Sequence, residues 1–144
     1  MLRGGGVAFG PHPRDFSTDL PKKIYDLAWR TALSYRYRKG ELIIVDNGME
    51  IDYPKTRFVK QIFAQNHWGN PDGRSMVVTS SFRSNLFRAL RYAEEDGRVL
   101  TEDDVDVKNL LEMGRVIIEK QALDTILKNH QSDLVSKIKM AVDK

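Results

Sequence analysis

Leu42-Ile43-Ile44-Val45, followed directly by Asp46, is the stretch that decides the fold class of this 144-residue chain. A short, continuous apolar run of this kind is typical of a β-strand that is covered on both of its faces. Such strands belong to parallel sheets that lie between layers of helices. The stretch therefore predicts an α/β protein.

Further strands and helices alternate on either side of that run. We expect the other strands at 76–79, 99–100 and 115–118, the second of these on a weak signal. Apolar residues recur at helical spacing in the segments between them, which predicts helices at 21–39, 54–68, 85–95, 107–113 and 120–129. This alternation favours a parallel sheet with right-handed crossovers and helices on both faces.

The first helix has a defined start and stop. Pro21 suits a first helical turn, and Gly40 suits a helix end. Lys22 and Lys23 lie in the first turn, where the helix dipole disfavours cations by about 0.3–1 kcal/mol. A bound anion would explain that placement, and a solvated lysine pair at a frayed helix end is the alternative. The predicted core stripe is Ile24, Leu27, Ala28, Thr31 and Tyr35.

Helix caps are readable further along the chain. Ser84 is expected to cap the helix at 85–95, and Asp106 the helix at 107–113, which Gly114 would end. Beyond residue 130, four apolar residues at helical spacing hint at a marginal amphipathic tail. They are Leu134, Ile138, Ala141 and Val142.

Arginines on the helix at 85–95 are candidates for RNA contact. The acidic segment 94–96 follows them directly, so we interpret this surface as a solvated face of mixed charge. The arginines concerned are Arg83, Arg88 and Arg91.

Charge is unevenly distributed along the chain. The formal net charge is only +3, but residues 1–40 hold eight Lys and Arg against three Asp. Distribution matters more than the sum for binding a polyanion, so the implied partner is nucleic acid or another phosphate-rich surface. A mildly basic domain whose charge happens to be lopsided is the alternative.

The composition also limits the chemistry. No cysteine is present, which rules out disulfides, thiolate metal sites and a cysteine nucleophile. His12, His67 and His130 are too scattered to suggest a metal site, and Ser80-Ser81 lacks a nucleophile elbow. No apolar run is long enough for a membrane helix, and no secretory signal is recognisable. The sequence predicts no catalytic residues, no metal and no cofactor.

The first twenty residues are interpreted as a phosphate-gripping arm. Gly4-Gly5-Gly6 can adopt positive φ and approach another backbone closely, between charges at Arg3 and Arg14. No strand precedes the glycines, which argues against a nucleotide-binding loop, and a flexible leader is the alternative. We expect three regions: an extended Gly/Pro-rich basic arm at 1–20, a single α/β domain at 21–129, and a tail at 130–144.

Several motifs, taken in order, resemble the L4 family of large-subunit ribosomal proteins over about residues 3–128. The most specific part runs from the triple glycine to Lys22-Lys23 and Ala32-Leu33-Ser34. Later motifs count mainly through their order. They are the strand at 42–46, Pro54-Lys55-Thr56, Asn85-Leu86 with Ala89 and Arg91, Asp106-Val107 with Leu110-Leu111, and 116–123.

The resemblance implies a three-layer α/β/α domain with a four-stranded parallel sheet, whose expected strand order is 1-4-2-3. It also implies binding to large-subunit rRNA beside neighbouring ribosomal proteins, with no small-molecule substrate. In that family a long basic loop precedes the triple glycine, so we expect this chain to be a C-terminal part of a member. The residues expected to bind RNA are Arg3, Gly4, Gly5, Gly6, Arg14, Lys22, Lys23, Arg30, Lys55 and Thr56.

Two departures from the family pattern suggest an organellar branch. Residues 81–84 replace an acidic stretch that the family commonly has, and the loop at 66–74 is longer than usual. We therefore expect a mitochondrial location, with the bacterial cytoplasm as the alternative.

Two other classes of function stay open at this point. One is a small doubly wound enzyme or nucleotide-binding domain that uses Asp46 and Thr79, and the other is a protein-interaction module.

Overall fold

The computed structural model describes residues 4–46, 48–70 and 72–135. Helices and strands alternate, and all four strands of the sheet run parallel in the order β1-β4-β2-β3. The predicted fold class and strand order are confirmed. The elements are α1 (Lys22–Arg38), β1 (Leu42–Val45), α2 (Thr56–Gln65), β2 (Ser75–Thr79), α3 (Ser84–Leu90), β3 (Gly97–Thr101), α4 (Val107–Glu112), β4 (Arg115–Glu119) and α5 (Lys120–Asn129).

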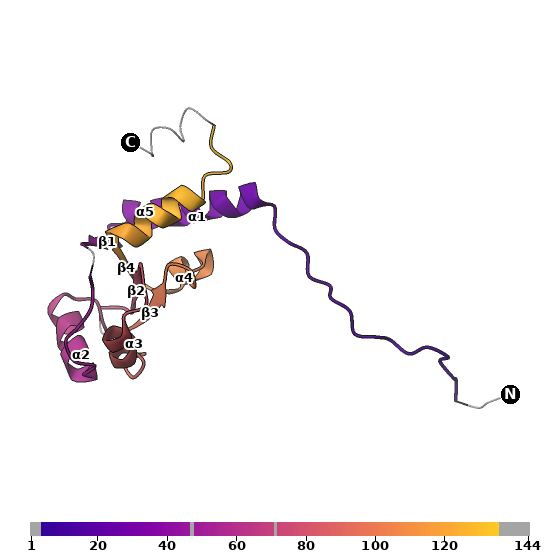
Figure 1. Cartoon of the computed structure of the whole chain (residues 1–144), viewed down its shortest axis with the longest axis horizontal. Helices are drawn as coiled ribbons and strands as arrows, with labels where there is room; N and C mark the ends of the chain where they lie inside the picture. The colour runs from indigo at the N-terminus through magenta and orange to yellow at the C-terminus, as the bar shows by residue number, and fades with distance from the viewer. Residues whose placement is uncertain (1–3, 47, 71, 136–144) are drawn as a thin grey trace.

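The sheet lies between two layers of helices (Figure 1). Alternate residues of the central strands β2 and β4 point to opposite faces, so each strand contributes to two separate cores. One core joins the sheet to α1, α4 and α5, and the other joins it to α2 and α3. The first core includes Trp29, Met76, Leu110, Val116 and Ile126, and the second includes Val59, Phe63, Val77, Leu90 and Ile117.

Strand β1, which decided the fold class, is less covered than its sequence predicts. Ile44 is 53% exposed, because β1 lies at one edge of the sheet and pairs only with β4. The central strands β2 and β4 are the ones that helices cover on both faces, since every residue of β2 and all but the first residue of β4 are buried. Strand β3, predicted on a weak signal, is a full five-residue strand paired with β2.

The predicted core stripe of α1 is wrong. Ile24, Leu27 and Tyr35 are about half exposed, and the buried face lies on the other side of the helix. That face includes two charged residues, Asp26 and Arg36, which sequence periodicity assigns to solvent. Arg36 is buried because its guanidinium donates to Leu110 O, Leu111 O, Met113 O and Gly114 O and pairs with Glu41. These contacts satisfy the carbonyls at the end of α4.

Helix α3 is shorter than predicted and begins differently. It spans Ser84–Leu90, and turns rather than helix occupy residues 91–96. Ser84 does not cap it. A distant carboxylate replaces the cap, since Glu50 Oε1 accepts a hydrogen bond from Leu86 N at 3.0 Å. Helix α2 is also shorter, ending at Gln65, whereas Asp106 caps α4 as predicted by accepting from Val107 N.

Residues 130–135 pack against α1. Asp26 accepts hydrogen bonds from Ser132 N at 2.9 Å and from the Ser132 hydroxyl, and it contacts His130 Nδ1 at 2.9 Å. The His130 ring stacks on Trp29. This segment is therefore tied to the helical layer, whereas most of the predicted amphipathic tail, from residue 136 onward, lies outside the described residues.

Candidate nucleic-acid interface

Residues 4–21 extend away from the sheet and its helices without forming a helix or strand (Figure 1). Every one of these residues is exposed. Two local contacts occur: Asp15 Oδ1 accepts from Ser17 N at 2.8 Å, and the Arg14 guanidinium lies 4.5 Å from the Phe16 ring centroid. The hydrogen bond from the Ser17 amide lowers the pKa of Asp15. We call residues 4–21 the arm.

The glycines of the arm have the conformations expected of them. Gly4 and Gly5 have φ of 124° and 67°, a region that residues with a side chain rarely adopt. Apart from the neighbouring residues, no atom in the part of the chain that the structure describes lies within 4 Å of where a Cβ would stand on either residue. The backbone conformation therefore favours glycine at both positions, while no packing contact within the described residues excludes a side chain, which leaves room for an external surface to approach. Arg3 lies outside the described residues.

Lys22 and Lys23 begin α1 where the arm joins it. Both are exposed, the first turn contains no acidic residue, and Pro21 provides no side-chain cap. Neither ammonium group has an ion-pair partner among the described residues. The helix dipole and two unpaired lysines therefore place positive charge at one end of the helical layer.

The structure does not gather all of the predicted RNA-binding residues at that end. Arg30 forms an ion pair with Asp133, so its charge is already compensated within the chain. Lys55 and Thr56 begin α2, which lies on the opposite face of the sheet from α1. Lys55 is exposed, and its Nζ lies 5.8 Å from the Tyr53 ring centroid. The described candidates therefore form two separate groups, with Arg30 in neither.

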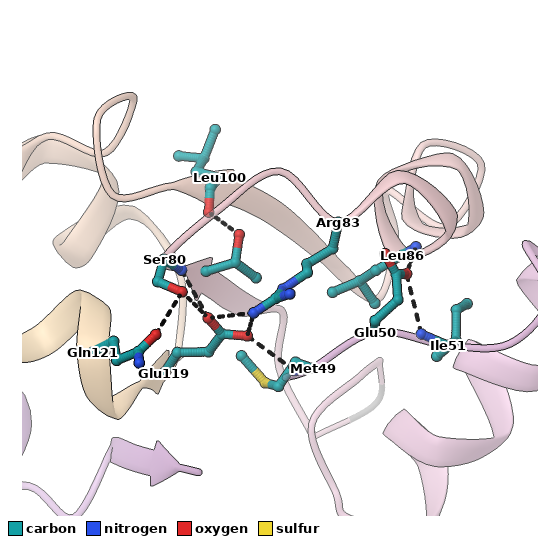
Figure 2. A network of polar contacts seen from close by, with 10 residues as sticks. Met49, Glu50, Ile51, Ser80, Arg83, Leu86, Leu100, Glu119 and Gln121 are labelled. Carbon is teal, nitrogen blue, oxygen red and sulfur yellow. Dashed lines mark hydrogen bonds and ion pairs between the residues drawn. The ribbon is translucent and has the colours of Figure 1, made fainter. Parts of the chain in front are cut away.

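Sequence reasoning missed a cluster of polar contacts that surrounds Glu119 at the carboxyl end of β4 (Figure 2). This carboxylate is fully buried. It accepts from Met49 N at 2.9 Å, from Ser80 N at 2.8 Å, from Ser80 Oγ at 2.6 Å, and from Arg83 at 3.3 Å. We call these four residues the Glu119 cluster. The only signal in the sequence was an acidic residue that closes an apolar strand.

The cluster keeps Glu119 ionised. Burial acts to raise the pKa of Glu119, but the hydrogen bonds from Ser80, Met49 and Arg83 outweigh it and lower the pKa to about 2. The cluster lies where ligands bind in doubly wound proteins, at the carboxyl ends of neighbouring strands. Here the chain's own groups engage both carboxylate oxygens. Thr79 is buried nearby, and its hydroxyl contacts Leu100 O at 3.4 Å.

The described residues, 4–46, 48–70 and 72–135, contain neither a candidate metal site nor a candidate membrane-spanning helix. Within these ranges, no group of three or more His, Cys, Asp or Glu side chains is arranged to hold a metal ion. None of the helices there combines the length and the apolar character needed to cross a membrane.

Comparison with known proteins gives a consistent result. The model of the ribosomal protein L4/L1 family matches residues 1–129. The chain is 43% identical to the large ribosomal subunit protein uL4m of Neurospora crassa, over 96% of the chain and 49% of that relative. It is 35% identical to uL4 of Moorella thermoacetica, over 85% of the chain and 57% of the relative. The chain thus spans about half the length of these relatives.

Proposed function

Because the chain belongs to the ribosomal protein L4/L1 family, we propose that it is a structural constituent of the large ribosomal subunit, which binds rRNA and supports translation. Its partners are large-subunit rRNA and neighbouring large-subunit proteins. The observation that carries the proposal is the arm, whose exposed glycines and Arg14 lead into the unpaired Lys22 and Lys23 at the start of α1.

The mechanism is binding rather than turnover. Arg14, Lys22 and Lys23 neutralise phosphates and release counterions, while the backbone at Gly4–Gly6 lies against the RNA. The α/β domain at 21–129 holds the arm in position, and RNA shape supplies the specificity. Arg3 belongs to the same group, and Lys55 and Thr56 form a second contact. Arg30 contributes indirectly, because its ion pair with Asp133 holds the segment after α5 against α1.

The Glu119 cluster bears on the alternative of a small nucleotide-binding enzyme. A ligand at the carboxyl edge of the sheet would have to displace hydrogen bonds that Glu119 already accepts from Ser80 and Met49. Asp46, the acid that this alternative relied on, is exposed at the end of edge strand β1. We therefore propose no enzymatic activity and no cofactor.

The location that best fits is the mitochondrion, as part of the mitochondrial ribosome. Support comes from the similarity to uL4m of Neurospora crassa over nearly the whole chain. Bacterial uL4 proteins are also similar, so the bacterial cytoplasm is the alternative. Subcellular fractionation with detection of the tagged chain distinguishes the two locations.

Sedimentation of the tagged protein, with and without ribonuclease, tests the function. We expect co-migration with the large subunit that ribonuclease abolishes. The double variant Lys22→Glu/Lys23→Glu should lose this co-migration and bind rRNA with a weaker salt dependence, because two phosphate contacts are removed. The matched control is Lys108→Glu/Lys120→Glu, which reverses two exposed lysines on α4 and α5. Unchanged association of the Lys22→Glu/Lys23→Glu variant, or equal loss in the control, would refute RNA binding at the junction of the arm and α1.

A further inference from the structure

A basic groove runs along α3 and edge strand β3. Four arginines line it: Arg74, Arg88, Arg91 and Arg98. All four are exposed, and none has an ion-pair partner among the residues that the structure describes. One carboxylate, Glu94, also lines the groove. The groove therefore carries an excess of positive charge that the fold does not neutralise. We call it the α3–β3 groove.

An aromatic wall forms one side of this groove. Phe82 is 67% exposed, and its ring centroid lies 4.5 Å from that of Phe87, with the two rings tilted by 46°. A single exposed aromatic residue is ordinary on a protein surface. Phe82 differs because it lines the same groove as the four arginines, and most of its surface is left uncovered by the fold.

The Glu119 cluster fixes the chain on either side of Phe82, through Ser80 and Arg83, which Figure 2 shows at the Glu119 carboxylate. Ser80 and Arg83 lie on either side of Phe82 in the sequence, and both donate to the Glu119 carboxylate. Glu50 adds a third attachment by accepting from Leu86 N in the first turn of α3. The segment 80–86 is thus tethered to β4 and to the loop after β1. This tethering lets the segment present an aromatic ring to solvent in a defined place.

We propose that the α3–β3 groove binds single-stranded RNA, with guanidinium groups on the phosphates and an unpaired base stacked on Phe82. Planar guanidinium forks suit phosphate oxygens, and aromatic rings beside arginines are the usual means of holding splayed bases. The inference rests on the proposed function and adds a second RNA contact to it. Helix α3 and α1 cover opposite faces of the sheet, so the groove is separate from Lys22 and Lys23.

Fluorescence anisotropy with the full chain tests the groove against the arm. The probe is a labelled RNA hairpin with an unpaired loop, and a fully paired duplex of the same length is the comparison. We expect Arg88→Gln/Arg91→Gln to weaken hairpin binding roughly tenfold and to reduce the salt dependence by about 1.4 in log–log slope, as for two single-strand phosphate contacts. The charge-matched control, Lys108→Gln/Lys120→Gln, should change hairpin binding less than twofold.

A second variant separates stacking from charge. Phe82→Ala should weaken hairpin binding about tenfold without changing the salt dependence, because stacking on an aromatic ring is lost while all cations remain. Phe82→Tyr keeps the ring and should bind like wild type. Duplex binding should be unaffected by either change at Phe82. Circular dichroism and thermal unfolding confirm that each variant keeps its fold.

The outcomes separate this inference from the proposed function. If the wild-type chain binds neither RNA, both proposals fail. If Lys22→Glu/Lys23→Glu weakens binding while the groove variants bind like wild type, only the groove proposal fails. Selective loss of binding to labelled polyglutamate by the groove variants, with hairpin binding intact, would assign the groove to an acidic protein segment and would likewise overturn the proposal.

Discussion

The arm and the Glu119 cluster use charged residues in opposite ways. At the start of α1, Lys22 and Lys23 have no ion-pair partner among the described residues, and a Cβ placed on Gly4, Gly5 or Gly6 of the arm would meet none of these residues apart from its chain neighbours. At the carboxyl edge of the sheet, a fully buried carboxylate receives hydrogen bonds from three residues in two surrounding segments. Charges that the fold uses are compensated within the chain. Charges that the fold leaves uncompensated are available to a partner.

That difference can be tested by measuring how much substitutions in each region change the free energy of unfolding. A compensated, buried charge should contribute several kcal/mol, because its removal leaves donors without an acceptor. An exposed charge with no partner should contribute almost nothing to folding and should matter only for binding. The three substitutions below run from the largest expected loss of stability to the smallest.

Glu119→Gln should have the largest effect. A pKa lowered from 4.5 to about 2 corresponds to about 3 kcal/mol of native-state stability. We expect the variant to lose roughly that free energy of unfolding at pH 7, measured by urea denaturation. Because the folded pKa is the lower one, this contribution is present above pH 4.5 and disappears as the pH falls towards 2. The difference between wild type and variant should therefore narrow over that interval.

The control for this experiment is Glu95→Gln, which changes the same kind of group at an exposed position. It should leave the free energy of unfolding within about 0.5 kcal/mol of wild type. A Glu119→Gln loss that stays constant from pH 7 to pH 2 would contradict the role assigned to the ionised carboxylate.

Asp26→Asn should have an intermediate effect. Burial acts to raise the pKa of Asp26, but hydrogen bonds from Ser132 and His130 outweigh it and lower the pKa. An asparagine cannot accept from all of these donors, so we expect a loss of about 1–2 kcal/mol at pH 7. Amide hydrogen exchange at residues 131–135 should also become faster. The exposed Asp19→Asn in the arm is the matched control and should change neither measurement.

Gly5→Val should have the smallest effect on folding and a clear effect on assembly. Apart from the neighbouring residues, no atom of the described chain lies within 4 Å of a Cβ placed on Gly5, so thermal unfolding should be unchanged even though Gly5 has φ of 67°. Incorporation into the large subunit, measured by gradient sedimentation, should fall because a β-branched residue disfavours that backbone and crowds the RNA. Gly6→Val, whose position does not require positive φ, should incorporate better than Gly5→Val. Equal, normal incorporation of both variants would argue against close RNA approach.

Much of the fold was predictable because its signals are local. The alternation of apolar runs and helical periodicity predicted the parallel sheet, and helix α5 begins and ends at the predicted residues. The buried face of α1 was not predictable in the same way. Its sequence carries two apolar stripes, and the one that faces the sheet includes Trp29 and Leu33 together with Asp26 and Arg36. The cost of burying these two charges is offset by hydrogen bonds with groups distant in sequence, which helical periodicity does not reveal.

The candidate site also has one part that local sequence predicts and another part that depends on contacts between distant segments. Composition alone indicated the arm, because glycines, prolines and cations close together in sequence form a local pattern. The sequence by itself thus determined the fold class and the Gly/Pro-rich, exposed character of residues 4–21, and its resemblance to a family implied the strand order. Only the tertiary structure decided that Glu119 joins Met49, Ser80 and Arg83, and that Phe82 stands beside the arginines of the α3–β3 groove. The physical reason is that parallel strands distant in sequence end at one edge of the sheet, and side chains meet there without any regular spacing in sequence.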